Sequence, residues 1–202
     1  MTTNQRPALG RPRAFDVDQA LDRAMQVFWH QGYEGASLSD LTGAMGITRT
    51  SMYAAYGNKA DLFRKALQRY TAGPAGYVYE ALKEPTARTV AERILQGAAC
   101  ATTLPGRPAG CLGVQGALAV GESGRSANEA LIRWRRDGED AIRERFVRAR
   151  AEGDLPPDAD PAALARYLLT FAYGISVQAA TGVPRDELLQ VAQSALRAWP
   201  AT

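Results

Sequence analysis

The chain has 202 residues, enough to bury the core of one large domain or two small ones. Hydrophobic residues make up 46% of it and charged residues 22%. No run of about 18 apolar residues occurs and the first dozen residues contain no apolar signal core, so we expect a cytoplasmic protein without a membrane span. The formal net charge of +3 favours nucleic acid only slightly, and the two cysteines, Cys100 and Cys111, do not resemble a disulfide framework.

Apolar residues recur at helical spacing along the whole chain, and alternating strand patterns are nearly absent. This pattern predicts an all-α protein of about nine helices, with no internal repeat. We expect a flexible basic arm at residues 1–14, a three-helix head at residues 15–60 and a larger helical body at residues 61–202. The arm carries Arg11 and Arg13, and no acidic residue precedes Asp16. Positive charge is therefore expected at one end of the molecule.

Capping residues divide the head into short helices. Residues that favour helix starts alternate with glycines that favour helix ends. The expected starts are Asp16, Ser37 or Ser39, Thr48 and Asn58, and the expected ends are Gly32, Gly46 and Gly57.

In the body, a break at Gly73–Pro74 precedes a series of longer helices. Helices are expected at residues 86–103, at 111 to about 120, at 127–152, at 161–180 and at 185–199.

Residues 37–56 have the pattern of a helix-turn-helix, two short helices joined by a tight turn at Gly46. Apolar residues occupy the positions expected to face inward, namely Leu41, Met45, Ile47 and Met52. The positions expected to face outward on the second helix are polar or small: Arg49, Thr50, Ser51 and Ala55. Short side chains let a helix enter the major groove, and an arginine can pair with guanine through two hydrogen bonds. A plain αα-hairpin is the alternative, but the flanking donors Tyr53, Tyr56, Asn58 and Lys59 favour contact with DNA phosphates.

The stretch from Gly10 to Tyr70 resembles the DNA-binding domain of the tetracycline-repressor (TetR/AcrR) family. The resemblance rests on GRPRAFD, FWHQGYEGASLSDL, MGITRTSMYAAYGNK and ADLFRKAL, in that order and spacing. It implies a repressor that binds double-stranded operator DNA as a homodimer and is released by a small-molecule effector. It also implies that Arg49 and Ser51 face bases, that Ser39 lies near the groove edge, and that Ser37, Thr48, Tyr53 and Lys59 face phosphates. Positions 54 and 55, often aromatic and histidine in the family, are both alanine here.

The last two helices resemble the dimerisation elements of one TetR subgroup. Their apolar faces include Leu164, Leu168, Leu188, Ala192 and Leu196, more than one packing partner requires. Two such helices from each of two subunits would form a four-helix bundle. The alternative is that these faces serve only the core of one chain.

A sensing pocket is expected among the body helices. The candidate lining residues, each of which could equally be ordinary core, are Leu104, Cys111, Val114, Leu118, Trp134, Phe171, Tyr173 and Val177. Pro105–Ala119 resembles the proline-glycine-cysteine loop of the same subgroup, some of whose members sense oxidants or electrophiles. At a helix start near Arg107, Cys111 could be a reactive thiolate of that kind, but we favour the alternative of a small packing residue.

The sequence does not favour an enzyme. His30 is the only histidine, so neither imidazole chemistry nor a zinc site is expected. The acidic residues of the long helix alternate with arginines, which is typical of a solvated face rather than an acid–base pair. We therefore expect no catalytic residue, metal or cofactor. A helical interaction scaffold is the alternative from another class, and salt-sensitive, sequence-selective DNA binding would distinguish the two.

Overall fold

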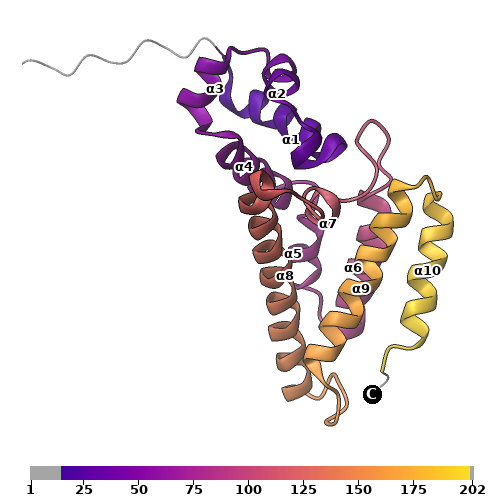
Figure 1. Cartoon of the computed structure of the whole chain (residues 1–202). Coiled ribbons are helices and arrows are strands. Elements are labelled where there is room, and N and C mark those ends of the chain that lie inside the picture. The colour runs from indigo at the N-terminus through magenta and orange to yellow at the C-terminus, as the bar shows by residue number, and fades with distance from the viewer. Residues whose placement is uncertain (1–14, 201–202) are drawn as a thin grey trace, which may run out of the picture.

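The computed structural model describes residues 15–200, so the expected basic arm with Arg11 and Arg13 lies outside the described residues. The predicted all-α class is confirmed (Figure 1). The helices are α1 (Val17–Gly35), α2 (Leu38–Met45), α3 (Arg49–Tyr56), α4 (Lys59–Ala72), α5 (Tyr77–Ala81), α6 (Ala87–Ala101), α7 (Leu112–Gln115), the 3-10 turn η1 (Glu122–Gly124), α8 (Arg125–Ala151), α9 (Pro161–Ala180) and α10 (Arg185–Arg197). Within residues 15–200, no helix is long and apolar enough to cross a membrane.

The helices of the head begin at the predicted caps. Asp16 accepts a hydrogen bond from the backbone N–H of Gln19 at 3.0 Å, and Thr48 and Asn58 cap α3 and α4 in the same way. Of the two serines proposed to open α2, Ser37 is the cap, because its side chain and Asp40 form a reciprocal capping box. Gly46 ends α2 in the left-handed conformation at φ +69°, which glycine adopts without steric cost.

The first hydrophobic core lies where the head meets the body. Aromatic rings of α1 pack edge-to-face on rings of α4: Phe28 lies 5.1 Å from Phe63 and Trp29 lies 4.9 Å from Tyr70, measured between ring centroids. The same core includes Leu112 of α7 and Leu131 of α8. The head therefore packs on the body through α4, across the domain boundary expected after residue 60.

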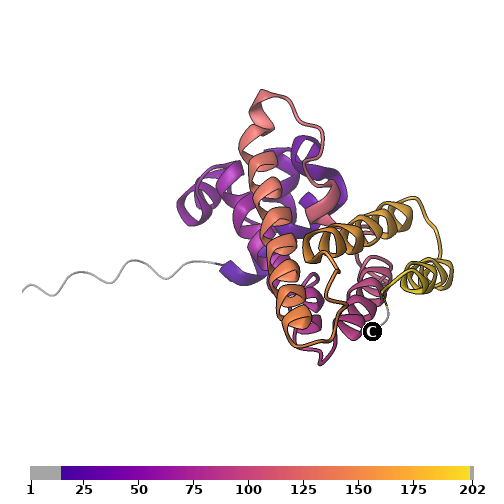
Figure 2. The same cartoon turned by 90° about the horizontal axis from the view of Figure 1, so that it is seen from below.

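The second core lies in the body and is formed by α5, α6, α8, α9 and α10. In Figures 1 and 2, α9 lies between α8 and α10, and it contacts both of them as well as α6. The largest fully buried side chains of this second core include Ile94 and Leu95 of α6 and Ile142 and Phe146 of α8. This core holds the body helices together beneath the head.

Three segments differ from the sequence prediction. The first helix was expected to end at Gly32, but α1 continues to Gly35, and Gly32 at φ +69° forms a kink within it. The helix expected from residue 111 to about 120 is only α7, four residues long, because the carbonyl of Gly116 leaves the helix and accepts a hydrogen bond from the N–H of Tyr33 at 2.7 Å. The short α5 was not predicted. Its five residues follow the Gly73–Pro74 break, and at Gly76, its N-cap residue, no side chain forms a capping hydrogen bond.

The buried hydrogen bond between Trp29 and Gly110 tests how the head is held on the body. The indole N–H of Trp29 donates to the carbonyl of Gly110 at 3.1 Å. Trp29→Phe keeps an aromatic ring but leaves that carbonyl without its partner, so we expect the free energy of unfolding to fall by about 2 kcal/mol. Urea denaturation measures the change. Tyr79→Phe removes an exposed hydroxyl and should change stability by less than about 0.5 kcal/mol. Equal stabilities of the two variants would contradict a stabilising role for the hydrogen bond between Trp29 and Gly110.

Candidate nucleic-acid interface and candidate effector cavity

The helix-turn-helix has the expected inner and outer faces. Leu41, Met45 and Met52 are buried, and Ile47 packs on the same core while half-buried. Because α3 buries Met52 and Tyr56, its opposite side is free, and Arg49, Thr50, Tyr53 and Ala54 are exposed there. A short helix with small and polar exposed side chains fits the width of a major groove.

Arg49 and Ser39, which are ten positions apart, meet at this surface. The Nη2 of Arg49 donates a hydrogen bond to the hydroxyl of Ser39 at 3.0 Å, and both residues are exposed. The bond holds the guanidinium against α2 and uses one of its five N–H donors. Ser39 thus orients the residue that the sequence identified as the main candidate for reading a base.

The candidate phosphate-contacting hydroxyls are used as helix caps. The Ser37 hydroxyl donates to Asp40 at 2.6 Å, and the hydrogen bonds from Ser37 lower the pKa of that carboxyl. The Thr48 hydroxyl donates to the hydroxyl of Ser51, which is half-buried, at 3.0 Å. Ser37 and Thr48 remain exposed, so each reaches a phosphate only by exchanging its present hydrogen bond.

Lys59 lies at the start of α4 beside α1. Its ammonium is 4.4 Å from the centroid of the Tyr33 ring, a cation–π contact. Burial lowers the pKa of Lys59, and the nearby Glu34 carboxylate opposes that shift. In the described state the ammonium therefore lies over α1, and its contact with a phosphate stays a prediction.

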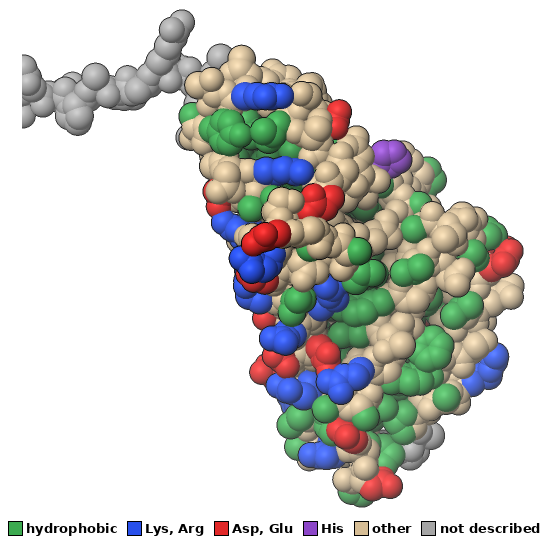
Figure 3. Space-filling view, in the orientation of Figure 1, with side chains coloured by type: hydrophobic (Ala, Val, Ile, Leu, Met, Phe, Trp, Pro, Cys, Tyr) green, Lys and Arg blue, Asp and Glu red, His purple; other side chains and the backbone are tan. Residues whose placement is uncertain are grey.

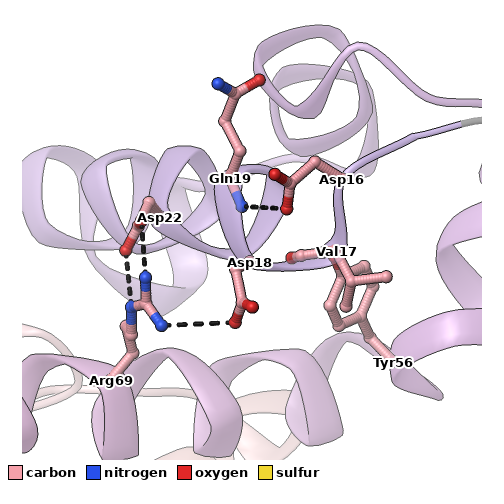
Figure 4. A network of polar contacts seen from close by, with 7 residues as sticks. All are labelled: Asp16, Val17, Asp18, Gln19, Asp22, Tyr56 and Arg69. Carbon is pink, nitrogen blue, oxygen red and sulfur yellow. Dashed lines mark hydrogen bonds and ion pairs between the residues drawn. The ribbon is translucent and has the colours of Figure 1, made fainter.

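Two predicted positions need correction. Tyr56 is buried and donates from its hydroxyl to the carbonyl of Val17 at 2.7 Å, so it does not face a phosphate (Figure 4). Ala55 is half-buried against the first core, and Ala54 is the exposed alanine instead. One helical position separates the two, so the periodic pattern alone did not distinguish them.

An ion-pair clamp joins α4 to α1, and the sequence analysis missed it. Arg69 donates two parallel hydrogen bonds to Asp22, both at 2.8 Å, and a third to Asp18 at 3.3 Å (Figure 4). Hydrogen bonding to Asp22 raises the pKa of Arg69. The partners lie 47 and 51 positions apart, so no local spacing could have indicated the clamp.

The candidate effector cavity lies among α4, α5, α8 and α9. It brings together three of the predicted lining residues, Cys111, Trp134 and Tyr173. It also includes residues that were not predicted, among them Thr71, Tyr77, Tyr79 and Ser176. Its volume is about 40 Å³, far below the roughly 300–1,000 Å³ of a typical ligand pocket.

The other predicted lining residues lie elsewhere. Leu104, Leu118 and Val177 are exposed, by 40%, 64% and 45%, because the first two lie in connecting segments and the third on the outer face of α9. Val114 is buried in the first core. Phe171 packs against Tyr167 with the two rings tilted, their centroids 4.8 Å apart.

Cys111 is buried, and the Tyr70 hydroxyl donates a hydrogen bond to its sulfur at 3.2 Å. Burial raises the pKa of the thiol, although the hydrogen bonds from Tyr70, Val114 and Gly113 oppose the shift. A protonated thiol is a poor nucleophile, and α7 is too short to supply much of a helix dipole. These features favour the packing role over the sensor.

The residues proposed for dimerisation pack in the core of their own chain. Leu168, Leu188, Ala192 and Leu196 are buried in the second core, and Leu164 packs against it. These five positions therefore do not form an exposed seam, which corrects their assignment. The outer faces of α9 and α10 expose Val177 and Val191, by 45% and 42%. In Figure 3 charged side chains gather over α8, whereas the surface over α9 is mainly hydrophobic or uncharged.

Within residues 15–200, no group of three His, Cys, Asp or Glu side chains could hold a metal ion, and His30 is exposed.

Comparisons with known proteins agree with this geometry. Residues 20–66 match the model of the family described as bacterial regulatory proteins, tetR family. The chain is 34% identical over 194 residues to the HTH-type transcriptional repressor ComR of Escherichia coli (strain K12), covering 95% of this chain and 92% of that protein. The TetR family regulator CifR, solved as a cysteine mutant in complex with 26-bp double-strand operator DNA, is 45% identical with a TM-score of 0.90, over 95% of this chain and 100% of that one. A putative TetR regulator from Rhodococcus sp. RHA1 is 42% identical, with a TM-score of 0.63, over 91% and 98% of the two chains.

The two cysteines should differ in their reaction with iodoacetamide. Cys100 is exposed, whereas Cys111 is buried and its pKa is raised, so its thiolate forms only at a higher pH than in an ordinary cysteine. At pH 7 we expect native chain to be alkylated at Cys100 alone, as measured by mass spectrometry of peptides. In urea both cysteines should react. Alkylation of native Cys111 as fast as Cys100 would support the reactive-thiol reading instead.

Proposed function

The chain belongs to the TetR family of bacterial regulatory proteins, and we propose that it represses transcription by binding double-stranded operator DNA as a homodimer until a small-molecule effector releases it. It is a helix-turn-helix transcriptional regulator and not an enzyme. The observation that carries the proposal is the exposed face of α3, with Arg49 held at its start by Ser39. The similarity to CifR, which was crystallised on operator DNA, supports the same docking for this chain.

On DNA, α3 would lie in the major groove. Arg49 would leave Ser39 or share its hydrogen bonds between Ser39 and a guanine, while Thr50 and Ala54 allow close approach to the base edges. Lys59, at the start of the next helix, would meet the backbone and fix the register. In a homodimer the two α3 helices would read half-sites about one DNA turn apart.

Release would act through α4. Thr71 of α4 lines the cavity and accepts a hydrogen bond from the indole N–H of Trp134 at 2.8 Å, and the neighbouring Tyr70 is bonded to Cys111. Arg69, one position earlier, is clamped to α1. An occupant that moves Trp134 or Cys111 would therefore shift α4 and, with it, the head. Such an effector lowers DNA affinity by as much as it prefers the shifted state.

Dimerisation is proposed to use the outer faces of α9 and α10. Val177→Glu combined with Val191→Glu places charges on side chains that are exposed in one chain, so each subunit should fold but dimers should dissociate. Light scattering at micromolar concentration measures the mass. Val147→Glu makes the same change at a 46% exposed valine of α8 and should leave the dimer intact. A wild-type monomer, or a double variant that stays dimeric, would contradict this interface.

DNA binding is tested with fragmented genomic DNA that includes the promoter region of the chain's own gene. The fragment bound most tightly then serves for isotherms on point variants at several salt concentrations. Arg49→Ala should cost about 1–3 kcal/mol and relax the preference at one base pair of each half-site. Lys59→Ala should weaken all sequences alike and reduce the slope of log affinity against log salt by roughly one per subunit.

Arg148→Ala is the matched control for these two variants. Arg148 is exposed in the last turn of α8, and its loss should change neither affinity nor slope. Reordered sequence preferences in Lys59→Ala but not in Arg49→Ala would show that α3 is not docked in this way. Absence of any salt-sensitive, sequence-selective binding would favour the scaffold.

A further inference from the structure

The walls of the cavity among α4, α5, α8 and α9 carry no charged side chain among the described residues. The nearby guanidinium of Arg135 is turned to the backbone, because its Nη1 donates to the carbonyls of Gly113 and Val114 at 3.4 and 3.1 Å. A charged occupant would leave water without gaining an opposite charge, which is costly. The cavity therefore selects against ions.

Three tyrosines line the cavity, of which Tyr77 and Tyr173 are half-buried and Tyr79 is 43% exposed. Among residues 15–200, the hydroxyls of Tyr77 and Tyr173 have no hydrogen-bond partner, whereas the hydroxyls of Thr71 and Ser176 are already bonded. Burial raises the pKa of both phenols, so both keep their protons at neutral pH. Each can thus donate to an acceptor atom on the occupant.

The cavity must enlarge to hold more than water. Its volume is about 40 Å³, whereas an apolar cavity of about 150 Å³ holds a molecule such as benzene. Tyr77 is the lining residue best placed to move, because it borders both the cavity and the open groove between α5 and α6. Its ring packs on Gly97 of α6, where any larger residue would collide with it. It also begins the five-residue α5, which has little helical structure of its own to hold it.

We propose that this cavity binds a small, uncharged, largely apolar molecule with one hydrogen-bond acceptor, and that the molecule enters as Tyr77 swings toward the groove. The inference rests on the proposed function in taking this occupant as the effector. The phenols of Tyr77 and Tyr173 hold its acceptor, and the apolar walls hold the remainder.

Three fluorinated aromatics of similar size test the charge preference by ¹⁹F NMR titration of the full chain without DNA. 4-Fluoroacetophenone is a neutral ketone, 4-fluorobenzoate an anion and 4-fluorobenzylammonium a cation. The ketone should bind saturably, with a dissociation constant at least about tenfold below that of either ion. An ion that binds as tightly as the ketone, or a ketone that does not bind, would overturn the proposal.

Gly138→Leu tests the location. Gly138 lines the cavity from α8, and a Cβ there would meet no atom within 4 Å, so a side chain at this position can begin without a clash and occupy the space that the ketone needs. This variant should melt at or above the wild-type temperature, because glycine is unfavourable inside a helix, and should lose ketone binding. Asp137→Leu adds the same side chain on the exposed side of α8 and should bind normally. Wild-type ketone binding by a folded Gly138→Leu variant would overturn the proposal.

Tyrosine variants test the acceptor and the entrance. Wild-type chain should prefer the ketone to 4-fluoroethylbenzene, which lacks the acceptor, and Tyr77→Phe combined with Tyr173→Phe should abolish that preference. Tyr77→Ala should speed association of the ketone. An unchanged preference in the double variant would contradict the phenol contacts, and an unchanged association rate would contradict the entrance.

The proposed function is tested separately. Fluorescence anisotropy measures whether the chain binds the tightest genomic fragment and whether the ketone releases it. A chain that binds the ketone in the cavity but binds no DNA would overturn the proposed function and leave the cavity assignment supported. A chain that binds DNA but prefers ions in the cavity would overturn the cavity assignment alone.

Discussion

Helix α4 is packed on two sides at once, and the rest of the structure depends on this constraint. Toward the head, Phe63 packs on Phe28 and Arg69 pairs with Asp22. Toward the body, the Tyr70 hydroxyl donates a hydrogen bond to the sulfur of Cys111, and the Thr71 hydroxyl accepts one from the indole N–H of Trp134. Because these four side chains share one helix of 14 residues, the head cannot change its angle without disturbing the cavity.

The segment from Gly110 to Gly116 completes this junction. Its two end carbonyls accept hydrogen bonds from α1: Gly110 from the indole of Trp29, and Gly116 from the backbone N–H of Tyr33. Those bonds turn the backbone toward the head, which ends α7 after one turn and places Cys111 beneath Tyr70. The burial of the Cys111 thiol is thus a consequence of how the segment is anchored, and the same contacts favour a packing role for it.

Local features of this chain were predictable, and distant pairings were not. Thr48 and Asn58 were identified as caps because a capping residue bonds to an N–H three positions away. Arg69 and Asp22, in contrast, meet only after folding. Periodicity showed that α9 and α10 have apolar faces, but it did not show what covers them. Leu168 and Leu188 therefore looked like interface residues although their own chain buries them. The cavity was found in part, since Cys111, Trp134 and Tyr173 converge there, while Tyr77 lies on a helix too short for its pattern to be recognised.

The small size of the cavity has a consequence for regulation. A ligand shifts an equilibrium only by the difference between its affinities for the two states. A pocket already large enough for the effector would bind it in both head positions and shift the balance little. With about 40 Å³ available, the described state offers an effector almost no room, so nearly all of its binding energy would favour the state in which Tyr77 has moved and α4 has shifted. In the proposed mechanism, a tight resting cavity beside a helix that the head shares would therefore let an effector discriminate strongly between the two head positions.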